Sequence, residues 1–237
     1  MVASVKINAC QLVMRIQTHE PFAFLQDDRW QGIDVEQGQA LAGRLGCQLS
    51  FVVTPWARGI ELLKAGKVDF MASVSRTPKR EKLFYFVGPQ RNESIRLVSH
   101  ARVMRPMSNW QQLMRLNARI MVQRGAFYGE RFERVLRKNY RLRRQLIETV
   151  QSDIRLELVQ KERVDGFVVD KLNAIYMINT NPKAQDLYIH PLVIHESPVY
   201  FAFSRVSTNP NRIIKIDKVV DELISDGTFG AIIARYQ

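Results

Sequence analysis

The sequence predicts an α/β protein in which helices cover both faces of a mainly parallel sheet. Three observations predict this class. Short β-prone runs alternate with helical patterns along the first half of the chain. The stretch 62–80, LLKAGKVDFMASVSRTPKR, passes from the end of an amphipathic helix through a tight turn into a short buried strand. The same plan returns at 158–170, LVQKERVDGFVVD, which indicates a second half-domain inserted into the first.

The beginning of the chain follows a β-α-β-α-β order. Asp34 is predicted to cap a helix that ends at Gly46, and Trp56 opens the next helix, which ends at Gly66. The three strands around these helices are expected at Val5–Cys10, Gln48–Val53 and Val68–Ala72.

The remaining elements are predicted from the same periodicities. Extended segments are expected at 94–99, 119–123, 146–150, 166–169, 188–193 and 199–204. Helices are expected at 109–116, from Gly125 through Leu136, from Ser152, and at 170–177, 213–223 and 228–236. Ligands bind such sheets at the carboxyl ends of the strands, where Ser73, Ser75 and Asp170 fall.

Composition excludes little. The chain has 237 residues and a net charge of +12, and 46% of its residues are hydrophobic, as in ordinary globular proteins. Much of the basic excess lies in 131–144, which we interpret as a solvated helix face because no nucleic-acid-binding motif accompanies it. We therefore expect no nucleic-acid partner.

Cys10 and Cys47 are the only cysteines. Cys10 is predicted to close the first strand and Cys47 to open the second, so they should lie at opposite ends of neighbouring parallel strands. We therefore expect two buried thiols and no disulfide. The cysteines therefore do not indicate whether the protein works in an oxidising or a reducing compartment.

The candidate binding residues follow the two repeated units. Arg80, after Ser73 and Ser75, offers a planar fork of donors that fits a carboxylate. Asp170 ends the second buried strand and can receive an ammonium group, cap the next helix, or do both. A zwitterion between the two half-domains would satisfy both charges. Trp56 and His19 are candidate walls, whereas Phe22, Phe24, Asp34, Asp69 and Asp165 are assigned to the core, caps and turns.

No motif of catalysis, metal binding or cofactor binding is present, including HExxH, GxGxxG and the P-loop. We expect no metal and no cofactor. Catalysis is not excluded by this, because a pocket that holds a zwitterion can also protonate or dehydrate it.

Five segments resemble one known family. They are HEPFAF, GIDVEQGQALAGRLG, LLKAGKVDFMASVSRTPKR, KERVDGFVVD and DGTFGAIIARY. In this order they resemble the aromatic loop, first helix, TPER loop, GRxDAxxxD segment and closing helix of the bacterial extracellular solute-binding proteins of family 3. These are the periplasmic amino-acid receptors of ABC transporters.

The resemblance implies a two-lobed type II periplasmic-binding-protein fold whose lobes are joined by two hinge strands. Lobe 1 would comprise 1–97 plus 192–237, and the inserted lobe 2 would comprise 98–191. Arg80 matches the family's arginine for the ligand α-carboxylate, with the hydroxyls of Ser73 and Ser75 beside it. Asp170 matches the carboxylate for the α-amino group, and His19 and Trp56 match aromatic wall positions.

Two departures from the family bear on the ligand. Gly125, Ala126 and Phe127 stand where the family usually has Gly-Thr-Thr or Gly-Ser-Thr at a helix start, so a hydroxyl is lost although the backbone N–H groups remain. Ile16 or a neighbour replaces an acidic residue of receptors for basic amino acids, which argues against lysine or arginine as the ligand.

The expected function is a monomeric periplasmic receptor, its export signal removed, that captures an amino acid or related organic acid by hinge closure. It would deliver this ligand to a membrane ABC permease. The alternatives on the same fold are a cyclohexadienyl- or arogenate-type dehydratase, with Glu20 or His19 as the proton donor, and a ligand-sensing module of a larger receptor. A nucleic-acid binder acting through 131–144 is a third, weaker hypothesis.

Overall fold

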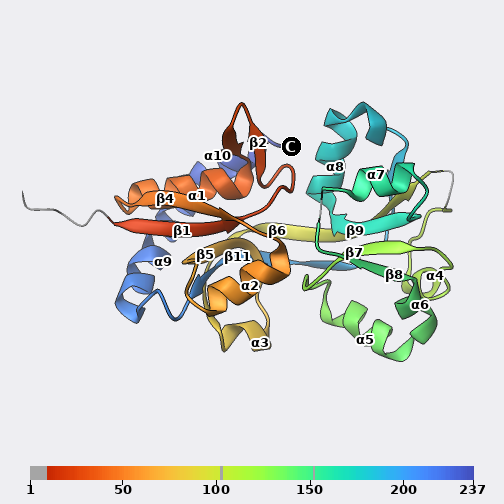
Figure 1. The fold of residues 1–237 in the computed structure, drawn as a ribbon, viewed down its shortest axis with the longest axis horizontal. Helices are drawn as coiled ribbons and strands as arrows, with labels where there is room; N and C mark the ends of the chain where they lie inside the picture. Colours follow the sequence, from red (N-terminus) through yellow and green to blue (C-terminus); the bar gives the residue numbers. More distant parts are fainter. Residues whose placement is uncertain (1–9, 102–103, 152) are drawn as a thin grey trace, which may run out of the picture.

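Two groups of strands and helices make up the molecule. The computed structural model describes residues 10–101, 104–151 and 153–237. Two long antiparallel strands, β6 (Phe84–His100) and β11 (His195–Ser204), run between the groups (Figure 1). Within the described residues, nine strands form one sheet in the order β4-β1-β5-β11-β6-β9-β7-β8, and β10 (Leu187–Ile189) pairs with β6. No helix in the described ranges is both long and apolar enough to cross a membrane.

The first group is built from both ends of the chain. Its parallel strands are β1 (Gln11–Ile16), β4 (Gln48–Val53) and β5 (Phe70–Ser75). A small hairpin joins β2 (Phe24–Gln26) to β3 (Arg29–Gln31). The helices are α1 (Ile33–Arg44), α2 (Trp56–Lys64), α3 (Pro78–Glu81), α9 (Pro210–Ser225) and α10 (Thr228–Ala234). In Figure 1, α1 and α10 lie on one side of these strands and α2 on the other, and α9 packs with α1 and α10 in one hydrophobic cluster.

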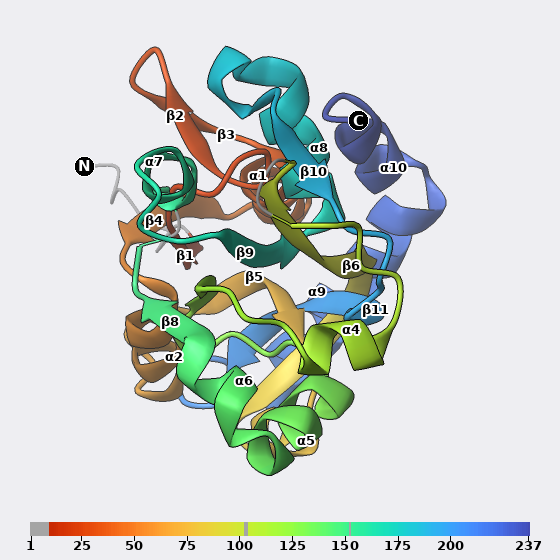
Figure 2. The ribbon, with the colours of Figure 1, turned by 90° about the vertical axis from the view of Figure 1, so that its right-hand side faces the viewer.

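The second group comes from the middle of the chain. Its strands are β7 (Ile120–Gln123), β8 (Leu146–Thr149) and β9 (Gly166–Asp170), with β7 parallel to both neighbours. Its helices are α4 (Trp110–Met114), α5 (Glu130–Lys138), α6 (Tyr140–Gln145), α7 (Arg155–Gln160) and α8 (Lys171–Thr180), followed by a 3-10 turn at Pro182–Ala184. The two views agree that α7 and α8 lie on one side of the strands, with α5 and α6 on the other (Figures 1 and 2).

Each group has its own hydrophobic core. In the first, Phe70 stacks on Phe203 with ring centroids 5.0 Å apart, and Phe201 meets Phe70 edge-on. In the second, Phe167 is fully buried and packs with Val98 and its neighbours. Separate cores leave the polar surface between the groups available for a site.

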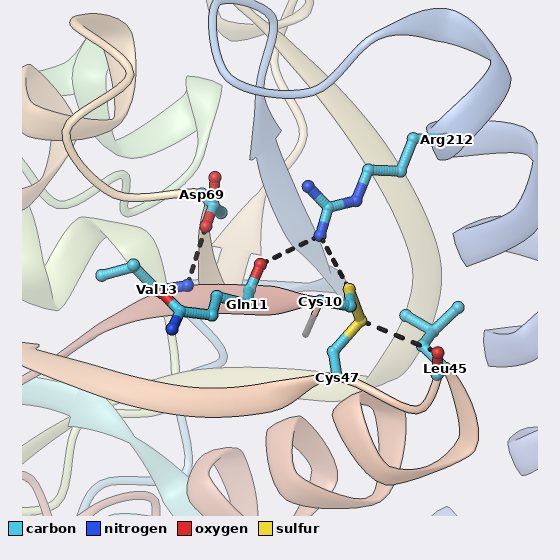
Figure 3. The surroundings of a disulfide bond; sticks show 7 residues. All are labelled: Cys10, Gln11, Val13, Leu45, Cys47, Asp69 and Arg212. Carbon is cyan, nitrogen blue, oxygen red and sulfur yellow. Dashed lines mark hydrogen bonds between the residues drawn. A yellow bond between two sulfur atoms is a disulfide. The ribbon is translucent and has the colours of Figure 1, made fainter. Parts of the chain in front are cut away.

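The predicted cysteine geometry is wrong, because β1 begins later than predicted. Residues 5–9 lie outside the described part, and Cys10 precedes β1, which starts at Gln11 and pairs with Gln48 of β4. Cys10 and Cys47 therefore stand at the same end of two parallel strands. They form a disulfide with their Cα atoms 4.4 Å apart (Figure 3).

Other observed element boundaries also differ from the predicted ones. β5 continues to Ser75 instead of ending at Ala72, and β6 extends over 17 residues where only 94–99 was predicted. The cap of α1 is Gly32 and not Asp34, because Asp34 lies inside the first turn. The predicted helix start at Ser152 falls on a residue outside the described ranges, and α7 is observed from Arg155.

The loop after β7 also differs from expectation. We predicted a helix directly after Gly125, but α5 begins at Glu130 with Gly129 as its cap. Residues 125–127 form a turn and loop between β7 and α5. Their N–H groups are therefore not at the positive end of a helix, so the predicted helix start is wrong, while the ligand-binding role of these residues stays a prediction.

Candidate ligand-binding site

A cavity of about 110 Å³ lies where the two groups meet. The first group contributes the carboxyl ends of β1 and β5 and the start of α2, and the second contributes the ends of β7 and β9 and the start of α7. β6 contributes side chains from its middle. Of the predicted residues, the lining includes His19, Trp56, Ser73, Ser75, Asp170, Ala126 and Phe127.

Ser73 is aimed by an irregularity in β5. Its φ of 54° is left-handed, and the pairing of β5 with β11 shifts register between Tyr200 and Ala202. Its backbone N–H donates to Gln90 Oε1 at 2.8 Å, and its hydroxyl donates to Asp34 Oδ1 at 2.8 Å. The bulge thus turns a strand residue toward polar partners instead of the next strand.

Asp170 has a cation partner within the protein. Arg91 Nη1 donates to Asp170 Oδ2 at 2.7 Å, with side-chain exposures of 5% and 7%. Arg91 Nη2 also donates to Ser73 Oγ at 3.2 Å, and the guanidinium lies over the ring of Phe22 at 4.2 Å. Asp170 Oδ1 accepts from the N–H of Leu172, so the predicted helix-capping role is confirmed.

Arg80 lies at the edge of the cavity rather than in its lining. Its Nη1 donates to Ser75 O at 3.0 Å, and its Nη2 donates to Gly125 O at 3.2 Å. Trp56 Nε1 donates to the same carbonyl at 3.2 Å. Both side chains of the first group therefore hold the backbone of the second, and Gly125 also lies outside the lining.

A second link joins the groups through His19. Arg155 Nη1 lies 3.4 Å from His19 Nδ1 and donates to Asn173 Oδ1 at 3.2 Å, while Asn173 Nδ2 donates to Glu20 O. Burial, followed by the positive charge of Arg155, lowers the pKa of His19 well below its usual range. His19 is therefore neutral and accepts from the guanidinium.

The sequence matches the family of bacterial extracellular solute-binding proteins, family 3, over residues 12–237. The chain belongs to this family. A probable histidine-binding protein of Campylobacter jejuni is 24% identical over 228 residues, covering 92% of this chain and 81% of that protein.

Solved structures share the fold. An ancestral arginine-binding protein bound to glutamine superposes with a TM-score of 0.81 at 22% identity, covering 95% of this chain and 97% of its own. An ancestral amino-acid-binding protein, a precursor of cyclohexadienyl dehydratase, superposes with a TM-score of 0.80 at 20% identity, covering 97% and 95%. The type II periplasmic-binding-protein architecture predicted from the motifs is confirmed, and this family member is a solute-binding protein.

Sequence reasoning missed several cavity residues of this solute-binding protein. The lining also includes Arg15, Asp34, Arg91, Glu93, Gln123 and Arg155. Arg15 carried a signal, because it interrupts the otherwise apolar strand LVMRI and a buried arginine in a strand needs a partner. Arg91 carried none, since one more arginine is not conspicuous in a chain of net charge +12.

Burial changes the protonation of these groups. It raises the pKa of Asp34 to about 6 and that of Glu93 to about 7, while Arg91 opposes both increases. It also lowers the pKa of Arg15 to about 9 and that of Arg155 to about 10. Both arginines still carry their charge at neutral pH, whereas Glu93 is partly protonated there.

Proposed function

We propose that this protein is a receptor whose two lobes close on a small carboxylate ligand, an amino acid or a related organic acid, and present it to a membrane ABC permease. The lobes are 1–97 plus 192–237 and 98–191, with β6 and β11 as the hinge. The cavity lined from both groups of elements carries this proposal, because only a closed arrangement gives a ligand partners on both sides.

The contacts across the cavity support closure as the working motion. Arg80 and Trp56 reach Gly125 on one side, and Arg155 reaches His19 on another. The buried Arg91–Asp170 ion pair also joins 1–97 to 98–191. The other contacts are hydrogen bonds to neutral acceptors, each contributing about 0.5–3 kcal/mol. Bonds of this strength can be broken and remade by a hinge motion.

The extracytoplasmic location expected of the family has support in the chemistry of the chain. The Cys10–Cys47 disulfide is stable in an oxidising compartment such as the periplasm and is rare in a reducing cytosol. We propose the periplasm as the site of action, with the protein as a monomer.

A dehydratase is the alternative that one observation favours. Glu93 is 8% exposed, lines the cavity and has a pKa of about 7, which suits a general acid. The donors expected earlier fit less well, because Glu20 is exposed and outside the lining and His19 is neutral. Binding without chemistry is favoured, because the relatives named above are binding proteins.

A thermal-shift screen followed by calorimetry tests the function. The panel contains the common amino acids, small mono- and dicarboxylic acids, polyamines and a cyclohexadienyl substrate. We expect at least one carboxylate to bind with 1:1 stoichiometry and to raise the free energy of unfolding by about 2.7 kcal/mol at 100 times its dissociation constant.

The fate of the ligand separates receptor from enzyme. NMR of the recovered solution should show the ligand unchanged after hours of incubation. Loss of water from the cyclohexadienyl compound would replace the receptor function with the dehydratase, and no binding across the panel would refute the receptor proposal.

A further inference from the structure

Several buried arginines gather at the cavity, whose lining also holds the acids Asp34, Glu93 and Asp170. Arg15 of β1, Arg91 of β6 and Arg155 of α7 line it, and Arg80 of α3 lies at its edge. The exposed fraction is 5% for Arg15 and 4% for Arg155. Burying a guanidinium is costly unless an anion or several acceptors compensate its charge.

Direct ion pairs with protein carboxylates compensate only part of this charge. Within the described ranges, Arg91 is the cavity arginine with a carboxylate within 4.0 Å, that of Asp170. Arg15 donates to Gln17 Oε1 and Thr54 O, both of which are neutral.

The other arginines also have neutral partners. Arg155 contacts His19 Nδ1 and Asn173 Oδ1, and Arg80 donates to two backbone carbonyls. Among the described residues, Arg15 in the first group and Arg155 in the second therefore have no carboxylate within 4.0 Å, although the charge of Asp34 acts on Arg15 from farther away.

The remaining acids of the cavity offset part of this charge. Asp34 accepts from Ser73 Oγ, and Glu93 accepts from Ser75 Oγ at 3.0 Å. With a pKa of about 6, Asp34 is mostly ionised at neutral pH, whereas Glu93, with a pKa of about 7, is partly protonated there.

Donors in the lining also lack acceptors. The buried Nε atoms of Arg15 and Arg91 and the buried Nε2 of Gln123 have no hydrogen-bond partner among the described residues. All three side chains line the cavity. Each of these unsatisfied atoms is an N–H donor, so the missing group is an acceptor, and an anionic acceptor would also compensate the charge.

We propose that the ligand carries two carboxylate groups, one compensating Arg15 on the side of the first lobe and one compensating Arg155 on the side of the second. This inference rests on the receptor function proposed above and narrows its ligand class to dicarboxylates. Two sources share this chemistry, the acidic amino acids and dicarboxylic acids without an amino group.

The Arg91–Asp170 pair bears on the choice between these sources. Each Asp170 oxygen already accepts a hydrogen bond, Oδ2 from Arg91 and Oδ1 from the N–H of Leu172. The guanidinium thus supplies the positive charge that an α-ammonium group would bring. A ligand without an amino group leaves no buried carboxylate unpaired here.

Calorimetry on the whole protein tests the proposal with succinate, glutarate, L-aspartate and L-glutamate. L-Glutamine is the matched probe, since it has the size of glutamate without the second charge, and L-arginine and L-histidine are the cationic probes. We expect at least one dicarboxylate to bind tenfold or more tightly than all three. The affinity ratio between glutamate and glutarate then identifies the source.

A variant pair locates the second charge. Arg155→Gln should weaken dicarboxylate binding at least tenfold and change the affinity for monocarboxylates less, whereas Arg163→Gln, on an exposed arginine, should change neither. Binding of L-arginine, L-histidine or L-glutamine with no dicarboxylate binding would overturn the inference while the receptor function stands. The wild-type comparison decides this even if Arg155→Gln does not fold, and silence across the wider panel would instead refute the receptor function.

Discussion

Glu93 shows at the scale of one residue how burial couples protonation to stability. Its carboxyl lies 8% exposed, accepts from Ser75, and has the charges of Arg91, Asp170 and Arg80 around it. Burial outweighs the arginines and raises its pKa from 4.5 to about 7. The folded protein therefore binds this proton more tightly than the unfolded chain does.

This linkage predicts a pH dependence of stability. Between pH 4.5 and 7 the folded state holds more protons at Glu93, so its contribution to the free energy of unfolding falls as the pH rises. Glu93→Gln keeps an acceptor for Ser75 and removes the titration. We expect the unfolding midpoint of this variant, relative to wild type, to rise by a few degrees from pH 5 to pH 8 in thermal melts.

The unfolding midpoint is compared with that of the wild type because the titration of His19 changes stability with pH in the opposite direction. Its lowered pKa makes the folded state lose stability as the pH falls below about 6.5. The effect of His19 is present in both proteins and cancels in the comparison, whereas the effect of Glu93 is present only in the wild type. Glu61→Gln, on an exposed residue of α2, is the matched control, and profiles of wild type and Glu93→Gln that run parallel would contradict the prediction.

The disulfide acts at the scale of elements, by tying the starts of β1 and β4 together. Cys10 and Cys47 are separated by 37 residues, which include the hairpin and α1. Arg212 of α9 adds a further tie, because it donates to Gln11 O at 3.0 Å beside the disulfide (Figure 3). The disulfide therefore closes the chain segment 10–47, which also contains His19 and Asp34.

Loss of this bond should destabilise the protein. A loop of this length gives about 3–4 kcal/mol in the chain-entropy estimate, or roughly 5–15 °C in the unfolding midpoint of a chain of this size. Cys10→Ser/Cys47→Ser should melt lower than the oxidised wild type by that amount and should not respond to reductant. Equal midpoints for wild type with and without reductant, with two free thiols detected after reduction, would show that the bond does not stabilise the fold.

Whether a sequence prediction was correct for a given element depended on where its strand begins and ends. Gln48–Val53 was predicted with the observed bounds because it is a short β-prone run between clear turns. The first strand was predicted at Val5–Cys10, before the observed β1. The apolar pattern continues through Cys10 into β1, and this pattern alone does not show where pairing with the neighbouring strand starts. The bulge at Ser73 arises from pairing with β11, which lies far away in the sequence.

At the scale of the whole molecule, the two groups fold around separate cores and are joined by contacts across the cavity. Arg80 is the clearest of these contacts, because one guanidinium joins Ser75 O to Gly125 O across the cavity edge. Its predicted role as the carboxylate partner stays a prediction. Either role makes it important for holding a ligand.

Arg80→Ala is therefore expected to weaken ligand binding. The loss should be about 2–5 kcal/mol if the side chain pairs with the ligand, and nearer 1 kcal/mol if it only joins the lobes. Calorimetry with the ligand found in the screen measures the change, and Lys79→Ala, on its exposed neighbour, provides the control. An unchanged affinity in Arg80→Ala would exclude both roles.

The sequence by itself determined the α/β class, most strands, and the placement of Ser75 and Asp170 at strand ends facing one site. These follow from local periodicity and from family motifs, which are properties of contiguous residues. Only the tertiary structure decided that Cys10 meets Cys47, that Arg91 pairs with Asp170, and that Arg15, Glu93 and Arg155 surround the same cavity. Those contacts join residues distant in sequence, and their energies depend on burial that no local pattern records.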